Sequence, residues 1–304
     1  MKIKNYRELD QKSVLLPLME QAFGWPFDPL EFEKTIRMDP RLKESSVGFC
    51  ALEGDEAVGF VGTMDLATRL TDGTSQHAGG VYGVATLPGH TRKGICTKLM
   101  NCAHGYFREK GYHFSFLTTS PTIVAYSLYK KLGYFDVTSF PGVYKVTEKT
   151  AKRKTPGTKK APLDFEKMLA IHQNYVDDKT GFVLRDTAYM KVLARFSDIR
   201  SSECIMASRS YAIFKKDQKQ VRIRELIAND KQEMRRLIEA VEEKAQNVVY
   251  GRAVLDASLR EVYKSLGFTV LESGHGVLMV KELANTSFSE AYGDKFFMTA
   301  LDHF

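Results

Sequence analysis

Apolar residues recur along the first half of the chain with two alternating periods. Spacings of three and four residues predict amphipathic helices, and apolar residues at every second position predict strands. The turn residues Gly54-Asp55 separate two strand-like runs, as in a hairpin. The predicted strands cover residues 2–6, 47–52, 57–66, 77–87, 113–118, 134–138 and 142–147, and the predicted helices cover 10–23, 92–110 and 121–132. Hairpins followed by strand–helix–strand predict an α/β (α+β) fold with a mixed sheet flanked by helices.

The second half repeats this mixture after a break in composition. Residues 148–162 carry six Lys or Arg, two Pro and one Gly, so they have no apolar face to bury. We interpret them as an exposed basic linker between a first domain, 1–147, and a second domain, 163–304. Predicted helices of the second domain cover 163–176, 186–196, 231–245 and 257–266, and predicted strands cover 203–207, 211–214, 221–228, 268–271 and 277–280.

A sequence echo links the two halves. The run SLYKKLGY at residues 127–134 resembles EVYKSLGF at residues 261–268, and two predicted strands follow each run. The echo indicates a duplicated domain.

Charge and cysteine content exclude several classes of protein. The chain has 44 basic and 37 acidic residues, and its net charge of +7 allows an anionic ligand without requiring nucleic acid. No run of 18 apolar residues occurs, and Glu8, Asp10 and Glu20 interrupt the N-terminus. We therefore expect a cytoplasmic protein with neither a membrane nor a nucleic-acid partner. Four cysteines without CxxC spacing, and the lack of HExxH, predict no metal site.

The stretch with the clearest chemistry is residues 81–96, VYGVATLPGHTRKGIC. A strand ends at Pro88, and a basic turn then opens an amphipathic helix. A helix N-terminus offers unpaired N–H groups and the positive end of a dipole, while Gly94 allows close approach to the backbone. Arg92 and Lys93 add full charges, so the ligand implied is a phosphate or pyrophosphate. GxxxxGK[ST] is absent, and no GxGxxG follows the strand.

This arrangement resembles the GCN5-related N-acetyltransferases (GNAT), whose pattern is Val-x-Val-x-Pro-x-x-[Arg/Gln]-x-x-Gly-x-[Gly/Ala] before a helix with a Leu-Leu or Leu-Met pair. The matching positions are Val84, Pro88, Gly94, Leu99 and Met100. Among the departures from the pattern, Thr91 replaces Arg or Gln, and Cys96 replaces Gly or Ala. We expect pyrophosphate binding to survive both changes, because Arg92 and Lys93 can supply the charge that Thr91 lacks and because cysteine is nearly as small as the usual Gly or Ala.

A later family motif, Ala-x-x-Leu-Tyr-x-x-Leu-Gly-[Phe/Tyr], is similar to residues 125–134, AYSLYKKLGY. The resemblance covers roughly residues 1–147, and the second half looks like a degenerate copy. Where the basic turn should be, residues 227–233 read IANDKQE, with two acids and no glycine, which would repel a pyrophosphate. Tandem domains of this kind resemble the Eis-like (enhanced intracellular survival) group.

The resemblance implies two tandem GNAT-like domains and an acyltransferase (EC 2.3.1) with acetyl-CoA as co-substrate. The acetyl group would pass to a primary amine, on a small molecule or a peptide, by direct attack in a ternary complex. The strand residues implied to bind the pantetheine arm are Val84, Ala85 and Thr86, and the turn residues implied to bind the pyrophosphate are Arg92, Lys93, Gly94, Ile95 and Cys96.

Two residues are implied to move protons. Tyr129 matches the family's tyrosine acid, which assists departure of the thiolate; the alternative is that it packs in the core beside Tyr126. Eis-like proteins are thought to use their C-terminal carboxylate as the base, and here Phe304 would carry it. A tail docked for stability alone is the alternative, and Asp302 and His303 are weaker base candidates.

Other readings stay open at this point. Cys96 at a helix start could act as a nucleophile, although a small filler residue is favoured. The chain could instead be a non-catalytic acyl-CoA-binding or regulatory module, which Thr91 favours and Tyr129 disfavours. Nucleic-acid binding depends only on the net charge and the basic linker. The resemblance also implies that residues 23–27 and the helix after them line the acceptor side. Self-association into a homo-oligomer is left open.

Overall fold

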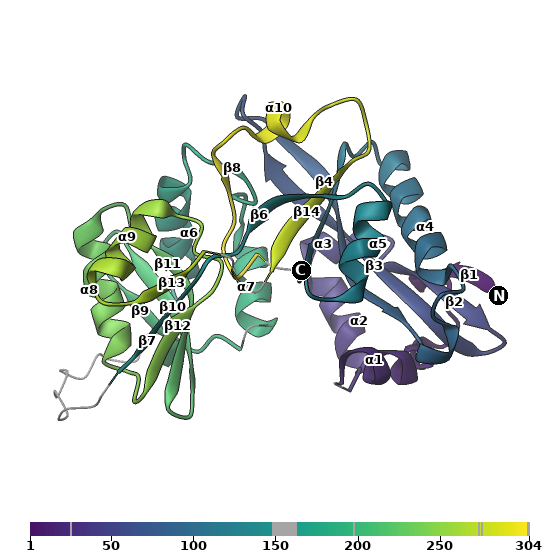
Figure 1. Cartoon of the computed structure of the whole chain (residues 1–304), viewed down its shortest axis with the longest axis horizontal. Coiled ribbons are helices and arrows are strands. Elements are labelled where there is room, and N and C mark those ends of the chain that lie inside the picture. Colours follow the sequence, from purple (N-terminus) through teal and green to yellow (C-terminus); the bar gives the residue numbers. More distant parts are fainter. Residues whose placement is uncertain (25, 148–162, 197, 273, 275, 303–304) are drawn as a thin grey trace. The chain divides into compact units, whose positions relative to one another are not determined.

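The computed structural model describes residues 1–24, 26–147, 163–196, 198–272, 274 and 276–302 (Figure 1). The expected linker, 148–162, lies outside the described residues. The described chain divides into two compact units. The first unit comprises Met1–Val137 and Leu278–Asp294, and the second comprises the described residues of Thr138–Val277 and of the segment from Lys295 to Asp302.

The first unit is built on one mixed sheet with the strand order β1-β2-β3-β4-β5-β14-β6. The strands are β1 (Lys2–Asn5), β2 (Gly48–Glu53), β3 (Glu56–Arg69), β4 (Ser75–Thr86), β5 (Phe114–Thr119), β6 (Phe135–Ser139) and β14 (Val277–Glu282). The helices are α1 (Leu16–Phe23), α2 (Pro29–Met38), α3 (Pro40–Lys43), α4 (Ile95–Glu109), α5 (Val124–Lys131) and α10 (Phe288–Tyr292). The first four strands are antiparallel and β4 pairs with β5 in parallel, so the predicted mixed sheet is confirmed.

Helix α4 supplies much of the first unit's core. Leu99, Met100, Ala103 and Phe107 recur at helical spacing and are buried where α4 packs on β2, β3 and β4. A fully buried large apolar side chain contributes about 1.5–3 kcal/mol. This stripe fixes the start of α4 against the end of β4.

The second unit has its own six-stranded sheet, in the order β13-β7-β12-β11-β10-β9. The strands are β7 (Gly142–Val146), β9 (Cys204–Met206), β10 (Tyr211–Asp217), β11 (Gln220–Ile227), β12 (Val248–Gly251) and β13 (Thr269–Leu271), and a short pair joins β8 (Thr180–Gly181) to β15 (Phe296–Phe297). The helices are α6 (Phe165–Tyr175), α7 (Thr187–Phe196), α8 (Lys231–Glu242) and α9 (Ala257–Ser265). Alternate residues of β10 enter different cores, one shared with α8 and α9 and the other with α6 and α7.

The two sheets exchange a strand. Strand β7, expected to close the first domain, lies between β12 and β13 of the second unit. Strand β14, expected in the second domain, lies between β5 and β6 of the first. The expected contiguous ranges 1–147 and 163–304 therefore do not coincide with the compact units. A strand's hydrophobic pattern says that it pairs, but not with which partner.

The sequence echo corresponds to a structural repeat. At the end of α5 the N–H of Tyr134 donates to the carbonyl of Tyr129 at 3.0 Å, and at the end of α9 the N–H of Phe268 donates to that of Tyr263 at 3.0 Å. The glycine before each second aromatic residue has a left-handed φ, 90° in the first unit and 80° in the second. Both helices stop in the same way, which supports the duplication.

Candidate functional site

Strands β4 and β5 part from each other within the first unit's sheet. Their parallel pairing runs from Gly79 with Ser115 to Val81 with Leu117. Strand β4 continues to Thr86, but no further pair joins these two strands in the described part of the chain. The sheet therefore opens at the carboxyl end of β4, as expected for a strand that precedes Pro88.

A β-bulge lies at the mouth of this opening. Gly83 and Val84 of β4 together face the single residue Val61 of β3. Gly83 has a φ of 56°, which a side-chain-bearing residue rarely adopts. Because the pairing of β4 with β5 ends at Val81, the backbone polar groups on this side of β4 beyond Val81 are available to a ligand in the opening.

The turn after β4 presents a row of backbone N–H groups. A 3-10 turn at Pro88–His90 leads to Arg92 (φ 61°) and Gly94 (φ 75°), and α4 begins at Ile95. The first helical bond runs from the N–H of Lys98 to the carbonyl of Gly94 at 3.0 Å. Among the described residues, no group accepts from the N–H groups of positions 92–97, and no side chain caps the helix. Such a helix start can bind an anion, so the start of α4 is a candidate anion site.

The charges and the free space around this turn fit a pyrophosphate. Arg92 and Lys93 are exposed, and within the described chain neither has an ion-pair partner. A Cβ placed on Gly94 would meet nothing within 4 Å, so the space above the turn is open. Thr91, which departs from the family pattern, donates its hydroxyl to the carbonyl of Pro88 at 2.9 Å. It stabilises the turn rather than contributing a charge.

Cys96 does not have the properties of a nucleophile. Burial raises the pKa of its thiol to about 11, so the thiol is protonated at neutral pH despite the nearby helix N-terminus. The favoured interpretation, a small filler residue, agrees with this.

Tyr129 lies on α5 and is buried, with 6% of its surface exposed. Burial, together with the nearby Cys96, raises the pKa of its hydroxyl, so Tyr129 remains protonated. No described group hydrogen-bonds to this hydroxyl. Its ring packs edge-to-face on Tyr134 with centroids 6.1 Å apart, while the hydroxyl of Tyr126 donates to Asp136 at 2.7 Å.

Of the three predicted base candidates, Asp302 lies among the described residues. Phe304 and His303 lie outside the described residues, so the terminal carboxylate stays a prediction. Asp302 is buried in the second unit and accepts from the guanidinium of Arg185 at 2.8 and 2.9 Å. A carboxylate engaged in this way is a structural anchor, so Asp302 is excluded as the base.

Asp302 belongs to a buried ion cluster that the sequence did not reveal. Arg185 also donates to Glu225 at 2.8 and 3.1 Å, and Thr299 donates to Glu225 at 2.7 Å. The guanidinium counteracts burial and lowers the pKa of Glu225 to about 2, whereas burial raises the pKa of Asp302. The cluster holds the segment 299–302 against β11. The signal in the sequence was an arginine, Arg185, directly after an apolar run.

The second unit keeps the opening but not the anion site. Strands β11 and β12 pair in parallel only up to Ile223 and Gly251, and β11 carries a bulge just beyond. However, the carboxylate of Asp230 caps α8 by accepting from the N–H of Glu233 at 2.8 Å. A carboxylate at this position repels a phosphate, which agrees with the prediction from residues 227–233.

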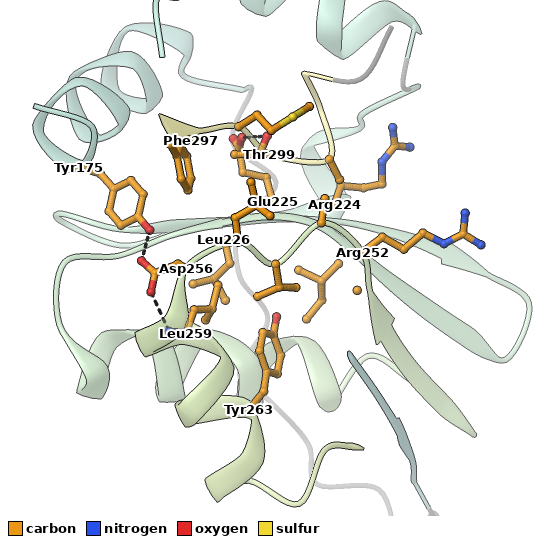
Figure 2. Close-up of a pocket in the computed structure, with 17 residues that line it drawn as sticks. Tyr175, Arg224, Glu225, Leu226, Arg252, Asp256, Leu259, Tyr263, Phe297 and Thr299 are labelled. Atoms are coloured by element: carbon orange, nitrogen blue, oxygen red, sulfur yellow. Dashed lines mark hydrogen bonds between the residues drawn. The ribbon is translucent and has the colours of Figure 1, made fainter. Parts of the chain in front are cut away.

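The opening in the second unit is reduced to a small cavity of about 30 Å³, whereas pockets for small-molecule ligands typically measure about 300–1,000 Å³. Figure 2 shows Tyr175 facing Asp256 at one side, where the tyrosine hydroxyl donates to the carboxylate, while Arg224 and Arg252 extend away. Residues 297–300 form part of its wall.

The described residues lack two further features. None of the helices there is long and apolar enough to cross a bilayer. Nor do His, Cys, Asp and Glu side chains of that part of the chain gather in threes around a possible metal position.

Comparison with known proteins finds a family match for residues 3–136 and a shared fold for most of the chain. The acetyltransferase (GNAT) domain family matches residues 3–136. No curated protein matches the sequence significantly. Among solved structures, a GCN5-related N-acetyltransferase from Kribbella flavida superimposes with a TM-score of 0.65 at 15% identity, over 92% of this chain and 70% of that one.

Two other structures extend this likeness. Eis1 from Mycobacterium abscessus gives a TM-score of 0.60 at 15% identity, over 93% of this chain and 74% of that one. A putative acetyltransferase from Pyrococcus horikoshii gives a TM-score of 0.57 at 12% identity, over 97% of this chain and 94% of that one. At these identities the likeness shows a shared fold.

Proposed function

Residues 3–136 match the acetyltransferase (GNAT) domain family, and from this match we propose that the chain transfers an acetyl group from acetyl-CoA to a primary amine. One observation carries the proposal. The opening between β4 and β5, the uncapped start of α4 and the hydroxyl of Tyr129 are all part of the first unit.

The first unit's residues suit the two ends of acetyl-CoA. The N–H groups of positions 92–96, aided by Arg92 and Lys93, would hold the pyrophosphate through charge-assisted hydrogen bonds. Backbone groups of Val84, Ala85 and Thr86 would bond the amides of the pantetheine arm, as strands bond an added strand. This would direct the thioester to the bulge in β4.

The reaction then needs two proton movements. A neutral amine attacks the thioester carbonyl, so that a C–N bond forms and the C–S bond breaks, and the proton that the attacking nitrogen then loses ends on the departing sulfur as the CoA thiol. The amine must first lose a proton, because its ordinary pKa is near 10. We assign that proton to the carboxylate of Phe304, which stays a hypothesis.

Tyr129 would assist the leaving sulfur. A thiol has a pKa of about 8.5, and burial keeps the pKa of Tyr129 above its ordinary value. Complete transfer of the tyrosine proton is therefore uphill, and the hydroxyl acts by donating a hydrogen bond as charge develops on sulfur. The absence of a competing partner for this hydroxyl among the described residues leaves it available.

The test is to incubate the full chain with acetyl-CoA and a panel of primary amines, including diamines and lysine-containing peptides. We expect mass spectrometry to detect an acetylated amine together with released CoA. A protein that binds acetyl-CoA but acetylates no amine would be the acyl-CoA-binding module instead. The lack of any acetyl-CoA binding would contradict both functions.

A further inference from the structure

A small polar cluster lies inside the otherwise apolar core between α4, β5 and the end of α5. The hydroxyl of Tyr134 is 2.6 Å from Oγ of Ser115 and 3.0 Å from Nε2 of His104. All three residues are buried, with at most 2% of their surface exposed. We call Tyr134, Ser115 and His104 the tyrosine cluster.

The cluster fixes the ring against which Tyr129 packs. The rings of Tyr134 and Tyr129 meet edge-to-face at 64°, and the backbone of Tyr134 also bonds that of Tyr129. Since no described group bonds the hydroxyl of Tyr129, the packing of its ring has the main part in orienting it. Any movement of the Tyr134 ring would therefore change the orientation of the Tyr129 ring.

The second unit shows what the fold alone requires. There Tyr263 and Phe268 keep the same backbone bond and the same 64° ring contact, with centroids 4.9 Å apart. Phe268 has no hydroxyl, so a helix end of this kind packs without a polar cluster. Burying a hydroxyl and an imidazole costs free energy that apolar side chains would not cost. The first unit bears this free-energy cost, and the first unit is also the one whose candidate anion site is open. The coincidence points to a functional rather than a structural reason for the polar cluster.

His104 is suited to holding a hydroxyl without adding charge. Burial, with Lys281 and Arg108 nearby, lowers the pKa of His104 to about 3, so its imidazole is neutral at physiological pH. A neutral imidazole and a serine hydroxyl offer Tyr134 one partner from α4 and one from β5. The Tyr134 ring is thus tied to α4, whose start is the candidate anion site, and to β5, which borders the opening.

We propose that Tyr134 is a positioning residue, held by Ser115 and His104, that orients Tyr129 toward the departing sulfur. This inference rests on the proposed acetyl transfer. It differs from a stability role because it predicts an effect on the chemical step.

The experiment compares Tyr134→Phe with Tyr292→Phe. The control removes another buried hydroxyl of the first unit, which lies 2.9 Å from Oγ1 of Thr68. We expect Tyr134→Phe to lower kcat for CoA release about five- to tenfold, with KM for acetyl-CoA unchanged, since only the transition state loses stabilisation. Tyr292→Phe should keep the wild-type kcat. Ser115→Ala, a milder second variant, should lower kcat by a factor about half as large as that of Tyr134→Phe.

A third comparison isolates the coupling. In a Tyr129→Phe background, Tyr134→Phe should lower kcat no further, because the hydroxyl that it positions is gone. A wild-type kcat in Tyr134→Phe, or an equal loss in Tyr292→Phe, would overturn the positioning role while leaving the acetyl transfer standing. Absence of transfer by the wild-type chain would overturn both.

Discussion

Replacing Gly94 by alanine adds one methyl group at the start of α4, where the pyrophosphate is proposed to bind. Gly94 has a φ of 75°, and its Cβ would meet nothing within 4 Å, so the protein itself offers no steric obstacle. The left-handed backbone costs alanine roughly 1–2 kcal/mol. For a chain of this size, each kcal/mol lowers Tm by about 2–4 °C.

We expect the loss of free energy of acetyl-CoA binding to be larger than the free-energy cost of this backbone strain. The methyl group would occupy the open space among the N–H groups at the helix start, and would displace the phosphate from at least one of them. A hydrogen bond to a charged group contributes about 1.5–3 kcal/mol, and each 1.4 kcal/mol is tenfold in affinity. Gly94→Ala should therefore weaken the Kd for acetyl-CoA by about tenfold or more.

Gly111 at the other end of α4 provides a matched control. It has a φ of 74°, and a Cβ there would also meet nothing within 4 Å. Gly111→Ala should lower Tm by a similar amount and leave the Kd unchanged. Calorimetric titration gives Kd, and thermal unfolding gives Tm. A wild-type Kd in Gly94→Ala, or an equal change in both variants, would refute the placement of the pyrophosphate.

Two further predictions concern charge. Replacing both Arg92 and Lys93 by alanine should weaken acetyl-CoA binding about tenfold at 50 mM salt and less at 0.5 M, because exposed charges are screened; titration at both salt concentrations checks this, and an effect independent of salt would contradict it. Glu225 has a folded pKa lowered to about 2 from 4.5, so it stabilises the fold above pH 4.5, and this contribution is lost as the pH falls from 4.5 to 2. Urea unfolding of the wild type and of Glu225→Gln at pH 7 and pH 3 should show a difference in stability that shrinks at the lower pH, and a constant difference would exclude Glu225 as its source.

Local structure could be predicted well where the sequence carries local signals. The strand before Pro88, the helix after it and the helix end at Gly133 are all present. Helix α4 begins at Ile95 rather than at position 92, because Arg92 and Gly94 both adopt left-handed backbone angles. Hydrophobic spacing does not report such angles.

The helix expected after residue 27 is present as α2, and its start carries a clear local signal. Asp28 caps α2 by accepting from the N–H groups of Leu30 and Glu31, and Pro29 occupies its first turn. An Asp-Pro pair before periodic apolar residues is a typical helix start. Strand β12, by contrast, was not predicted. It is only four residues long, and neither of its neighbours in the sheet, β7 and β11, is joined to it by a short turn.

The exchange of β7 and β14 and the burial of Arg185 could not be predicted from local pattern. Strand partners are chosen by packing across the whole sheet, and both strands have the same apolar character. Arg185 is buried because Glu225 and Asp302 compensate its charge, and these three residues are far apart in sequence. The roles of the predicted site residues are still hypotheses, although Tyr129, Gly94 and the turn before α4 belong to one unit.

The central claim is that the first unit transfers an acetyl group with the help of Tyr129. The most direct measurement is the initial rate of CoA release at saturating acetyl-CoA, with an amine that the wild type acetylates. Tyr129→Phe should lower this rate tenfold or more, as expected for the loss of one hydrogen bond to the charge that develops on sulfur, with an unchanged Kd for acetyl-CoA. An equal rate in the wild type and Tyr129→Phe would contradict the account.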